Sequence, residues 1–129
     1  MKRASFPTPS AMAERPWPSE LRLSPDKATF TVAFENGDRF ALAAEYLRVE
    51  SPSAEVQGHA ADQKQIVPGK HGVKIAALEP VGNYAVRIRF DDGHDTGLYS
   101  WVYLHELGRD RNKKWAAYVR ELRIRKLER

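Results

Sequence analysis

The sequence has no cysteine among its 129 residues. It can therefore form neither a disulfide framework nor a thiolate site for zinc or an iron–sulfur cluster, so any metal would be bound through nitrogen and oxygen atoms. It also lacks any apolar run near the roughly 20 residues of a bilayer-spanning helix, and residues 1–18 lack the apolar stretch of a signal peptide. We therefore expect a cytoplasmic protein with no membrane segment.

Length and composition indicate one soluble folded domain. Domains typically have roughly 100–150 residues, and a chain that is 42% hydrophobic and 29% charged has enough apolar surface for one core. The net charge is +4, but segment 109–129 alone holds nine Lys or Arg against three Asp or Glu. Because counterion release needs basic side chains over one contiguous face, this uneven distribution disfavours nucleic-acid binding.

The two ends of the chain differ in composition from the middle. Residues 1–18 contain four prolines and no apolar periodicity, which predicts a flexible arm. Residues 19–122 are expected to form the folded domain. Residues 123–129 are expected to be a basic tail that frays, because the apolar helical stripe stops at Leu122.

Two β-hairpins are predicted from alternating apolar and polar residues. The first joins residues 29–34 to residues 39–42 through Asn36-Gly37, a pair that favours a type I′ turn with positive φ at both positions. The second joins residues 73–79 to residues 84–90, with Tyr84 expected on the same inward face as the apolar residues that alternate with it. Hairpins of this kind form antiparallel sheets.

Short helices are predicted between and after these hairpins, at residues 43–48 and, capped by Ser100, at residues 101–107 with Gly108 just beyond the end. An apolar stripe predicts a final amphipathic helix from about residue 111. Residues 51–72 are expected to be a long loop, and such loops are often functional. The fold class is therefore predicted as α+β, with a small, mostly antiparallel sheet, short helices and a C-terminal helix.

One segment concentrates groups that could bind a metal. Asp91-Asp92-Gly93-His94-Asp95 places three carboxylates and an imidazole at the end of a strand, and such ligands suit iron, manganese or zinc. Asp and Gly are also the usual residues of tight turns, and the order matches neither a calcium loop nor an iron-oxygenase motif. The segment is thus compatible with a metal site and with an ordinary turn.

No enzyme signature accompanies this segment. Gly58-His59 and Gly69-Lys70-His71-Gly72 could place amides and cations around an anion, but they do not form a phosphate-binding loop and are also ordinary loop residues. No serine lies in a nucleophile elbow, and no nucleophile and base are paired by a recognised spacing. We therefore expect a protein without its own active site.

Three longer motifs carry a family resemblance. Segments 47–56, 79–86 and 90–101 together resemble, in this order, the DUF971 family of gamma-butyrobetaine hydroxylase-like N-terminal domains. The resemblance implies a compact α+β fold and metal binding, with iron as the expected metal. It also implies a link to iron–sulfur carrier ATPases of the Mrp type, to which similar domains are joined.

In the hydroxylases, the domain resembles a zinc module with three cysteines and one histidine. By this resemblance His94 stands at the histidine position, whereas Ser51, Ser53 and Val56 stand at the cysteine positions. Serine hydroxyls do not ionise near neutral pH, so the zinc site looks lost. The catalytic oxygenase domain has no counterpart in this chain, which again implies a non-catalytic role.

The leading hypothesis is an accessory binding domain whose site lies between residues 51–59 and 91–101. Its expected metal ligands are Asp92, His94 and Asp95, and its other binding groups are Arg48, Glu55, His59 and Tyr99. The cofactor is unknown, with iron as the candidate. The alternative hypothesis is a protein-interaction adaptor that docks an acidic partner through basic segment 109–129. Separately, the family resemblance implies an iron–sulfur carrier or an oxygenase as a candidate protein partner.

Overall fold

The computed structural model describes residues 16–58 and 64–129. The predicted arm lies almost entirely outside the described residues. The elements in chain order are β1 (Pro18–Leu23), β2 (Thr29–Phe34), β3 (Arg39–Ala43), α2 (Ala44–Val49), α3 (Ala54–Gln57), β4 (Ile75–Val81), β5 (Ala85–Phe90), β6 (Gly97–Ser100), α4 (Trp101–Arg109) and α5 (Arg111–Ile124).

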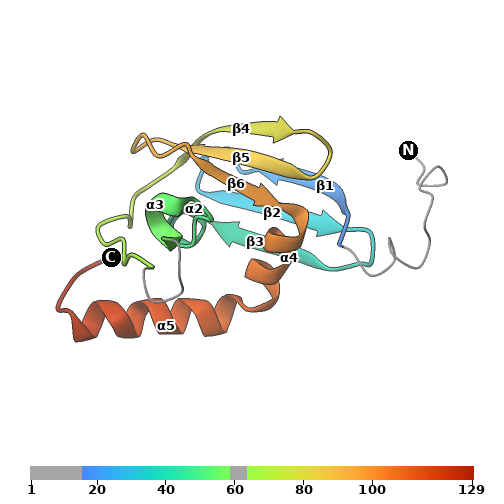
Figure 1. Cartoon of the computed structure of the whole chain (residues 1–129). Helices are drawn as coiled ribbons and strands as arrows, with labels where there is room; N and C mark the ends of the chain where they lie inside the picture. The colour runs from blue at the N-terminus through green and yellow to red at the C-terminus, as the bar shows by residue number, and fades with distance from the viewer. Residues whose placement is uncertain (1–15, 59–63) are drawn as a thin grey trace.

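The predicted α+β class with antiparallel hairpins is confirmed, and the strands form two sheets. One sheet has the order β1-β2-β3 and the other β4-β5-β6, and every strand pair in them is antiparallel. A single core joins the two sheets, because apolar residues of β2 and β5 belong to one buried cluster. In Figure 1, α5 runs along one side of the molecule, next to α2.

The first hairpin forms where it was predicted, but its turn is of another type. The Gly37 amide donates to the Phe34 carbonyl at 3.0 Å, and the Phe34 amide donates to the Asp38 carbonyl at 2.7 Å. Of the two expected turn residues, only Gly37 has a positive φ, at 100°. The loop is therefore a turn through Glu35 and Asn36 followed by a left-handed glycine, and the predicted type I′ turn is wrong.

The second hairpin is also confirmed, with one difference in how its side chains face. Val86, Ile88 and Phe90 are buried as the alternation predicts. Tyr84 was expected on the same face but is exposed, because the strand begins only at Ala85 and Tyr84 belongs to the turn before it.

Helix α4 begins as predicted and ends later. The Ser100 side chain accepts the Tyr103 amide at 3.1 Å, which confirms the cap. The helix continues through Gly108 to Arg109, so the prediction that Gly108 lies beyond its end is wrong. A Cβ atom at Gly108 would lie 2.2 Å from the Phe40 ring of β3. This glycine allows a close helix–sheet contact and does not terminate the helix.

The C-terminal segment departs from the expectation of fraying. Helix α5 continues to Ile124, and the residues after it turn back onto the protein. The Leu127 amide donates to the Leu122 carbonyl at 2.8 Å, and the Gly69 amide donates to the Glu128 carbonyl at 2.9 Å. Hydrogen bonds thus attach the tail to the body, and a periodicity argument could not anticipate them. No helix in the described ranges is long and apolar enough to cross a bilayer.

Candidate functional site

The turn between β5 and β6 directs His94 into the protein. The Phe90 amide donates to the His94 carbonyl at 2.9 Å, and Gly93 adopts a φ of 95° that glycine tolerates best. The Asp92 carboxylate accepts the His94 amide at 3.1 Å, as aspartate often does in turns. His94 is consequently buried, with an exposed fraction of 7%.

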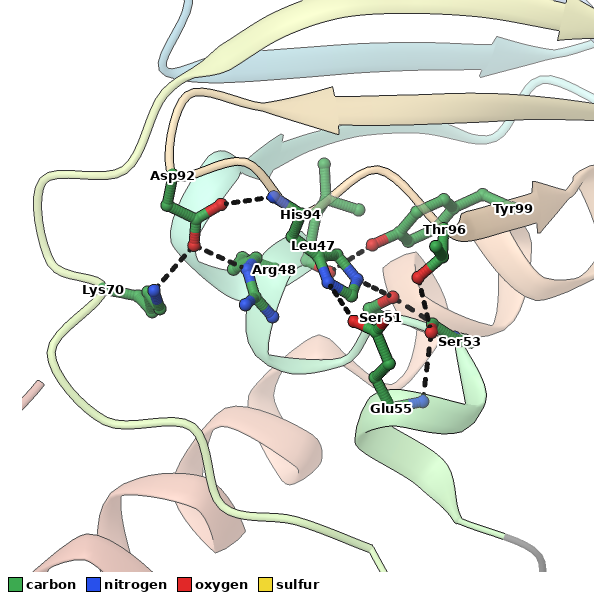
Figure 2. Close-up of polar contacts among 10 residues, drawn as sticks. All are labelled: Leu47, Arg48, Ser51, Ser53, Glu55, Lys70, Asp92, His94, Thr96 and Tyr99. Atoms are coloured by element: carbon green, nitrogen blue, oxygen red, sulfur yellow. Dashed lines mark hydrogen bonds and ion pairs between the residues drawn. The ribbon is translucent and has the colours of Figure 1, made fainter.

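The His94 ring contacts the segment that follows α2, as the leading hypothesis requires. Its Nε2 lies 2.9 Å from the Ser51 hydroxyl oxygen, and its Nδ1 lies 3.2 Å from the Glu55 carboxylate (Figure 2). Burial lowers the pKa of His94, and the nearby Arg48 charge lowers it further. An ionised carboxylate can only accept hydrogen bonds. The neutral His94 ring therefore donates a hydrogen bond from Nδ1 to Glu55 and accepts one from the Ser51 hydroxyl at Nε2.

A second pair of hydroxyls closes the same junction. Ser53 Oγ lies 2.7 Å from Thr96 Oγ1, and it also accepts the Glu55 amide at 3.1 Å at the start of α3 (Figure 2). The Ser53 amide in turn donates to Ser51 Oγ at 3.2 Å. We call Ser51, Ser53, Glu55, His94 and Thr96 the hydroxyl–imidazole cluster. It links residues 51–55 to residues 94–96.

Beside this cluster, Asp92 binds two cations. Its Oδ2 accepts Arg48 Nε at 2.8 Å and lies 2.6 Å from Lys70 Nζ. Burial opposes ionisation of Asp92, but hydrogen bonds from Lys70, from the His94 amide and from Arg48 outweigh it and lower the pKa to about 2. Arg48 Nη1 is buried and has no hydrogen-bond partner in the described part of the chain.

The other predicted site residues are placed differently. Tyr99 is fully buried and donates to the Leu47 carbonyl at 2.5 Å, so it stabilises the end of α2 and is not open to a ligand. Asp95 is exposed, and no hydrogen bond or ion pair joins it to another described residue. His59 lies outside the described residues. The structure therefore brings together Arg48 with Asp92, and Glu55 with His94.

The sequence interpretation missed the partners that complete these contacts. Ser51 and Ser53 entered it only as replaced cysteines, and Thr96 and Lys70 were not assigned to the site. One local signal was present, because Ser53 caps the four-residue helix α3, which lies within the predicted long loop.

The donor set does not fit a metal centre. Within residues 16–58 and 64–129, no three His, Asp or Glu side chains are placed to share a cation. Asp92 is turned toward Arg48 and Lys70, Asp95 is exposed, and both ring nitrogens of His94 have partners. The expected ligand set of Asp92, His94 and Asp95 therefore does not converge.

Ser51, His94 and Glu55 have the hydrogen-bond order of a hydrolase triad, but their surroundings exclude that chemistry. A nucleophile must reach its substrate, and Ser51 has an exposed fraction of 0%. Gly97 packs so closely that a Cβ atom on it would lie 2.6 Å from Ser51 Oγ. The Ser51–His94 contact at the centre of the cluster is therefore a buried crosslink.

A more accessible feature is a hollow of about 450 Å³ between α5 and the segments at residues 49–50 and 64–66, which we call the α5 groove. Tyr118 fixes one wall, because its hydroxyl donates to the Val67 carbonyl at 2.7 Å. Four apolar or partly apolar residues and several charged ones line it: Val49, Ile66, Ala117 and Tyr118, with Glu50, Lys64, Lys113, Lys114, Glu121 and Arg125.

Basic residues outnumber acidic ones in the α5 groove. Lys64 pairs with the buried Glu50 at 2.7 Å, and Arg125 pairs with Glu121 at 2.8 Å. Lys113 is exposed, and no described acidic side chain pairs with it. The rim therefore carries surplus positive charge above an apolar floor.

Comparison with known proteins identifies the family. The sequence model of the gamma-butyrobetaine hydroxylase-like N-terminal domain matches residues 21–105. The chain belongs to this family. The matched range contains both the hydroxyl–imidazole cluster and the Asp92 ion pairs, so these contacts lie inside the family domain, whereas α5 lies beyond the match.

Solved structures agree with this assignment. A crystal structure of a protein of unknown function in the DUF971 family, from Acidithiobacillus ferrooxidans, is 38% identical over 70% of this chain and 91% of its own, with a TM-score of 0.59. Two NMR solution structures have TM-scores of 0.77. One is 41% identical over 89% of this chain, the other 42% over 100%, and each match spans 90% of the solved chain. No curated protein matches significantly.

Within the gamma-butyrobetaine hydroxylase-like domain, the three residues that the resemblance places at cysteine positions have visible roles. Ser51 hydrogen-bonds to His94, Ser53 to Thr96, and Val56 is buried. Hydrogen bonds and apolar packing hold these segments together through neutral side chains.

Proposed function

We propose that this gamma-butyrobetaine hydroxylase-like domain is a non-catalytic interaction module that binds an acidic, amphipathic segment of a partner protein in the α5 groove. The observation that carries the proposal is the combination of an apolar floor with surplus lysine charge on the rim. The family resemblance makes an iron–sulfur carrier ATPase of the Mrp type the first partner to test, and an oxygenase the second.

The chemistry of the α5 groove favours such a segment. Apolar side chains of an amphipathic helix would be buried against Ile66, Ala117 and Tyr118, which supplies the hydrophobic part of binding. Lys113 and Lys114 would face its carboxylates. Among the described residues, the Lys114 ammonium pairs only with Glu106, at 3.5 Å, and such a partly exposed pair stabilises little and can exchange partners.

The decisive experiment compares two charge reversals of equal size on the same helix. Lys113 and Lys114 line the α5 groove, whereas Arg120 and Arg123 are exposed and do not line it. Binding of the purified Mrp-type carrier is measured by biolayer interferometry for wild type, K113E/K114E and R120E/R123E. We expect the groove variant to bind about tenfold more weakly, equivalent to roughly 1.4 kcal/mol.

The control variant R120E/R123E should stay within about twofold of wild type, since Arg120 and Arg123 do not line the groove and exposed charges away from it are screened by salt. Binding should also weaken with added salt, because exposed charges are screened. Equal loss in both variants would show a nonspecific charge effect and contradict docking in the α5 groove. Failure of both the carrier and the oxygenase to bind the wild-type protein would also contradict docking in the α5 groove.

A metal-binding function, with iron as the metal, has weaker support. The exposed Glu55 carboxylate beside His94 is the observation in its favour, since an imidazole and a carboxylate are suitable ligands. Calorimetric titration of chelator-treated protein with Fe²⁺ or Zn²⁺ tests it. An affinity tighter than millimolar that is lost in His94→Ala would support a metal role for this site.

A further inference from the structure

Glu45 is a buried carboxylate on the first turn of α2. Its side chain has an exposed fraction of only 7%. The Arg129 guanidinium forms two hydrogen bonds to it, from Nη2 to Oε1 at 2.9 Å and from Nε to Oε2 at 3.1 Å. A buried carboxylate requires such a cation, because removing one partner leaves an uncompensated charge.

An aromatic wall completes the surroundings of Glu45. The Arg129 guanidinium carbon lies 5.5 Å from the centre of the Trp115 ring, in cation–π geometry. The Tyr46 ring contacts Trp115 edge to face at 6.2 Å between centroids, which orients the indole. A pocket of about 240 Å³ surrounds these groups and is lined by Ala43, Glu45, Tyr46, Arg111, Trp115 and Arg129.

This combination is selective for a guanidinium. A planar fork can bind both carboxylate oxygens and stack on an aromatic face at the same time, whereas a lysine ammonium acts as a point charge. The two groups that bind the guanidinium, Glu45 and Trp115, lie on helices α2 and α5.

Arg129, which lines the pocket and binds Glu45, is more exposed than the Glu45 carboxylate. The Arg129 side chain has an exposed fraction of 47%. It follows a non-helical segment in which Lys126 has a φ of 60°, a conformation that costs energy for a residue other than glycine. The Lys126 and Leu127 amides donate to the Arg123 and Leu122 carbonyls, and the Glu128 carbonyl accepts the Gly69 amide. Arg129 thus lies outside regular secondary structure, whereas Glu45 and Trp115 are carried by helices α2 and α5.

We propose that the pocket formed by Glu45, Tyr46 and Trp115 is an arginine-recognition site, closed by the chain's own Arg129. An arginine side chain of a partner protein takes its place when the tail moves away. This site is separate from the α5 groove, and its test does not depend on the proposed function.

The test uses the full chain and an arginine tripeptide, acetyl-Gly-Arg-Gly-amide, with the lysine tripeptide and free arginine as comparisons. Binding is followed by NMR at the Trp115 indole. In Arg129→Ala, the arginine tripeptide should bind about tenfold more tightly than to wild type. In the wild type, Arg129 occupies the site in most molecules, so only a small fraction of the protein is free to bind the peptide. The lysine tripeptide should bind several-fold more weakly than the arginine tripeptide.

Two further variants separate the pocket from general charge effects. The double variant E45Q/R129A should lose the binding gained in R129A. R123A, at an exposed arginine that lines neither this pocket nor the α5 groove, should behave as wild type. Equal binding by wild type and R129A, or retained binding in E45Q/R129A, would overturn the proposal. Free arginine binding without tripeptide binding would also overturn it, because the site would then not accept a protein side chain.

A wild-type measurement covers the case in which Arg129→Ala does not fold. At high tripeptide concentration, the ligand should displace the tail, and the Arg129 Nε resonance should shift toward that of a solvent-exposed arginine. An unchanged Arg129 resonance at saturating peptide would contradict the proposal.

Discussion

The imidazole of His94 lies 2.9 Å from the hydroxyl of Ser51, which ties the β5–β6 turn to the segment that follows α2. Both groups are buried, and neither is available to a substrate. The contact is therefore best understood as a polar crosslink that positions two neighbouring segments, and its loss should be measured as stability.

We expect His94→Ala to destabilise the protein by about 1–3 kcal/mol, because the buried Ser51 hydroxyl would lose its acceptor on the imidazole. Urea unfolding followed by circular dichroism measures this change. Asp95→Ala, at the exposed neighbouring position, is the matched control and should change stability by less than about 0.5 kcal/mol. Equal stability of both variants would contradict the crosslink.

Gly97→Ala should damage the same junction from the other side. An added Cβ would lie 2.6 Å from Ser51 Oγ and 3.0 Å from the Tyr99 ring. Displacing Ser51 should cost about 1–3 kcal/mol, as overpacking does elsewhere. Gly72→Ala is the control, since no atom lies within 4 Å of its added Cβ. Thermal unfolding compares the two, and a neutral Gly97→Ala would show that the junction is loose.

Gly108→Ala should destabilise the protein although it lies within a helix. Alanine in a helix interior is normally favoured over glycine by about 1 kcal/mol. Here its Cβ would lie 2.2 Å from the Phe40 ring, so the sign should reverse. The double variant with Phe40→Leu should recover part of the loss, because a smaller side chain makes room. Stabilisation by Gly108→Ala alone would refute the proposed close contact.

The free energy of unfolding should fall as the pH drops below about 6.5, the ordinary pKa of a histidine side chain. Burial lowers the pKa of His94 in the folded state, so the unfolded chain binds a proton first and is favoured as pH falls. In His94→Asn this part of the pH dependence should disappear between pH 6.5 and 5. Urea midpoints across this range measure it, and NMR titration should place the His94 transition below 6.5.

The elements that the sequence predicted well are those with local causes. The Ser100 cap depends on a side chain and an amide three residues apart, and the second hairpin depends on alternation within one strand pair. The first hairpin was located correctly, but its turn type was wrong, because the Asn-Gly pair is compatible with more than one loop geometry.

The candidate site was predicted only in part. The family resemblance implied that residues 91–101 would meet residues 51–59. The structure places His94 against Ser51 of that segment, and Asp92 against Arg48 of α2. The sequence could not show that Arg48 and Lys70 would neutralise Asp92, since the lysine comes from a loop more than twenty residues away.

Composition and local pattern alone determined the α+β class, the absence of thiolate chemistry, the hairpin positions and the cap of α4. Tertiary structure decided that Gly108 packs on Phe40, that Ser51 bonds to His94 and that Arg129 reaches Glu45. The physical reason is that local propensities act within a few residues. A buried polar or charged group takes its partner from whichever distant segment the fold brings within hydrogen-bond reach.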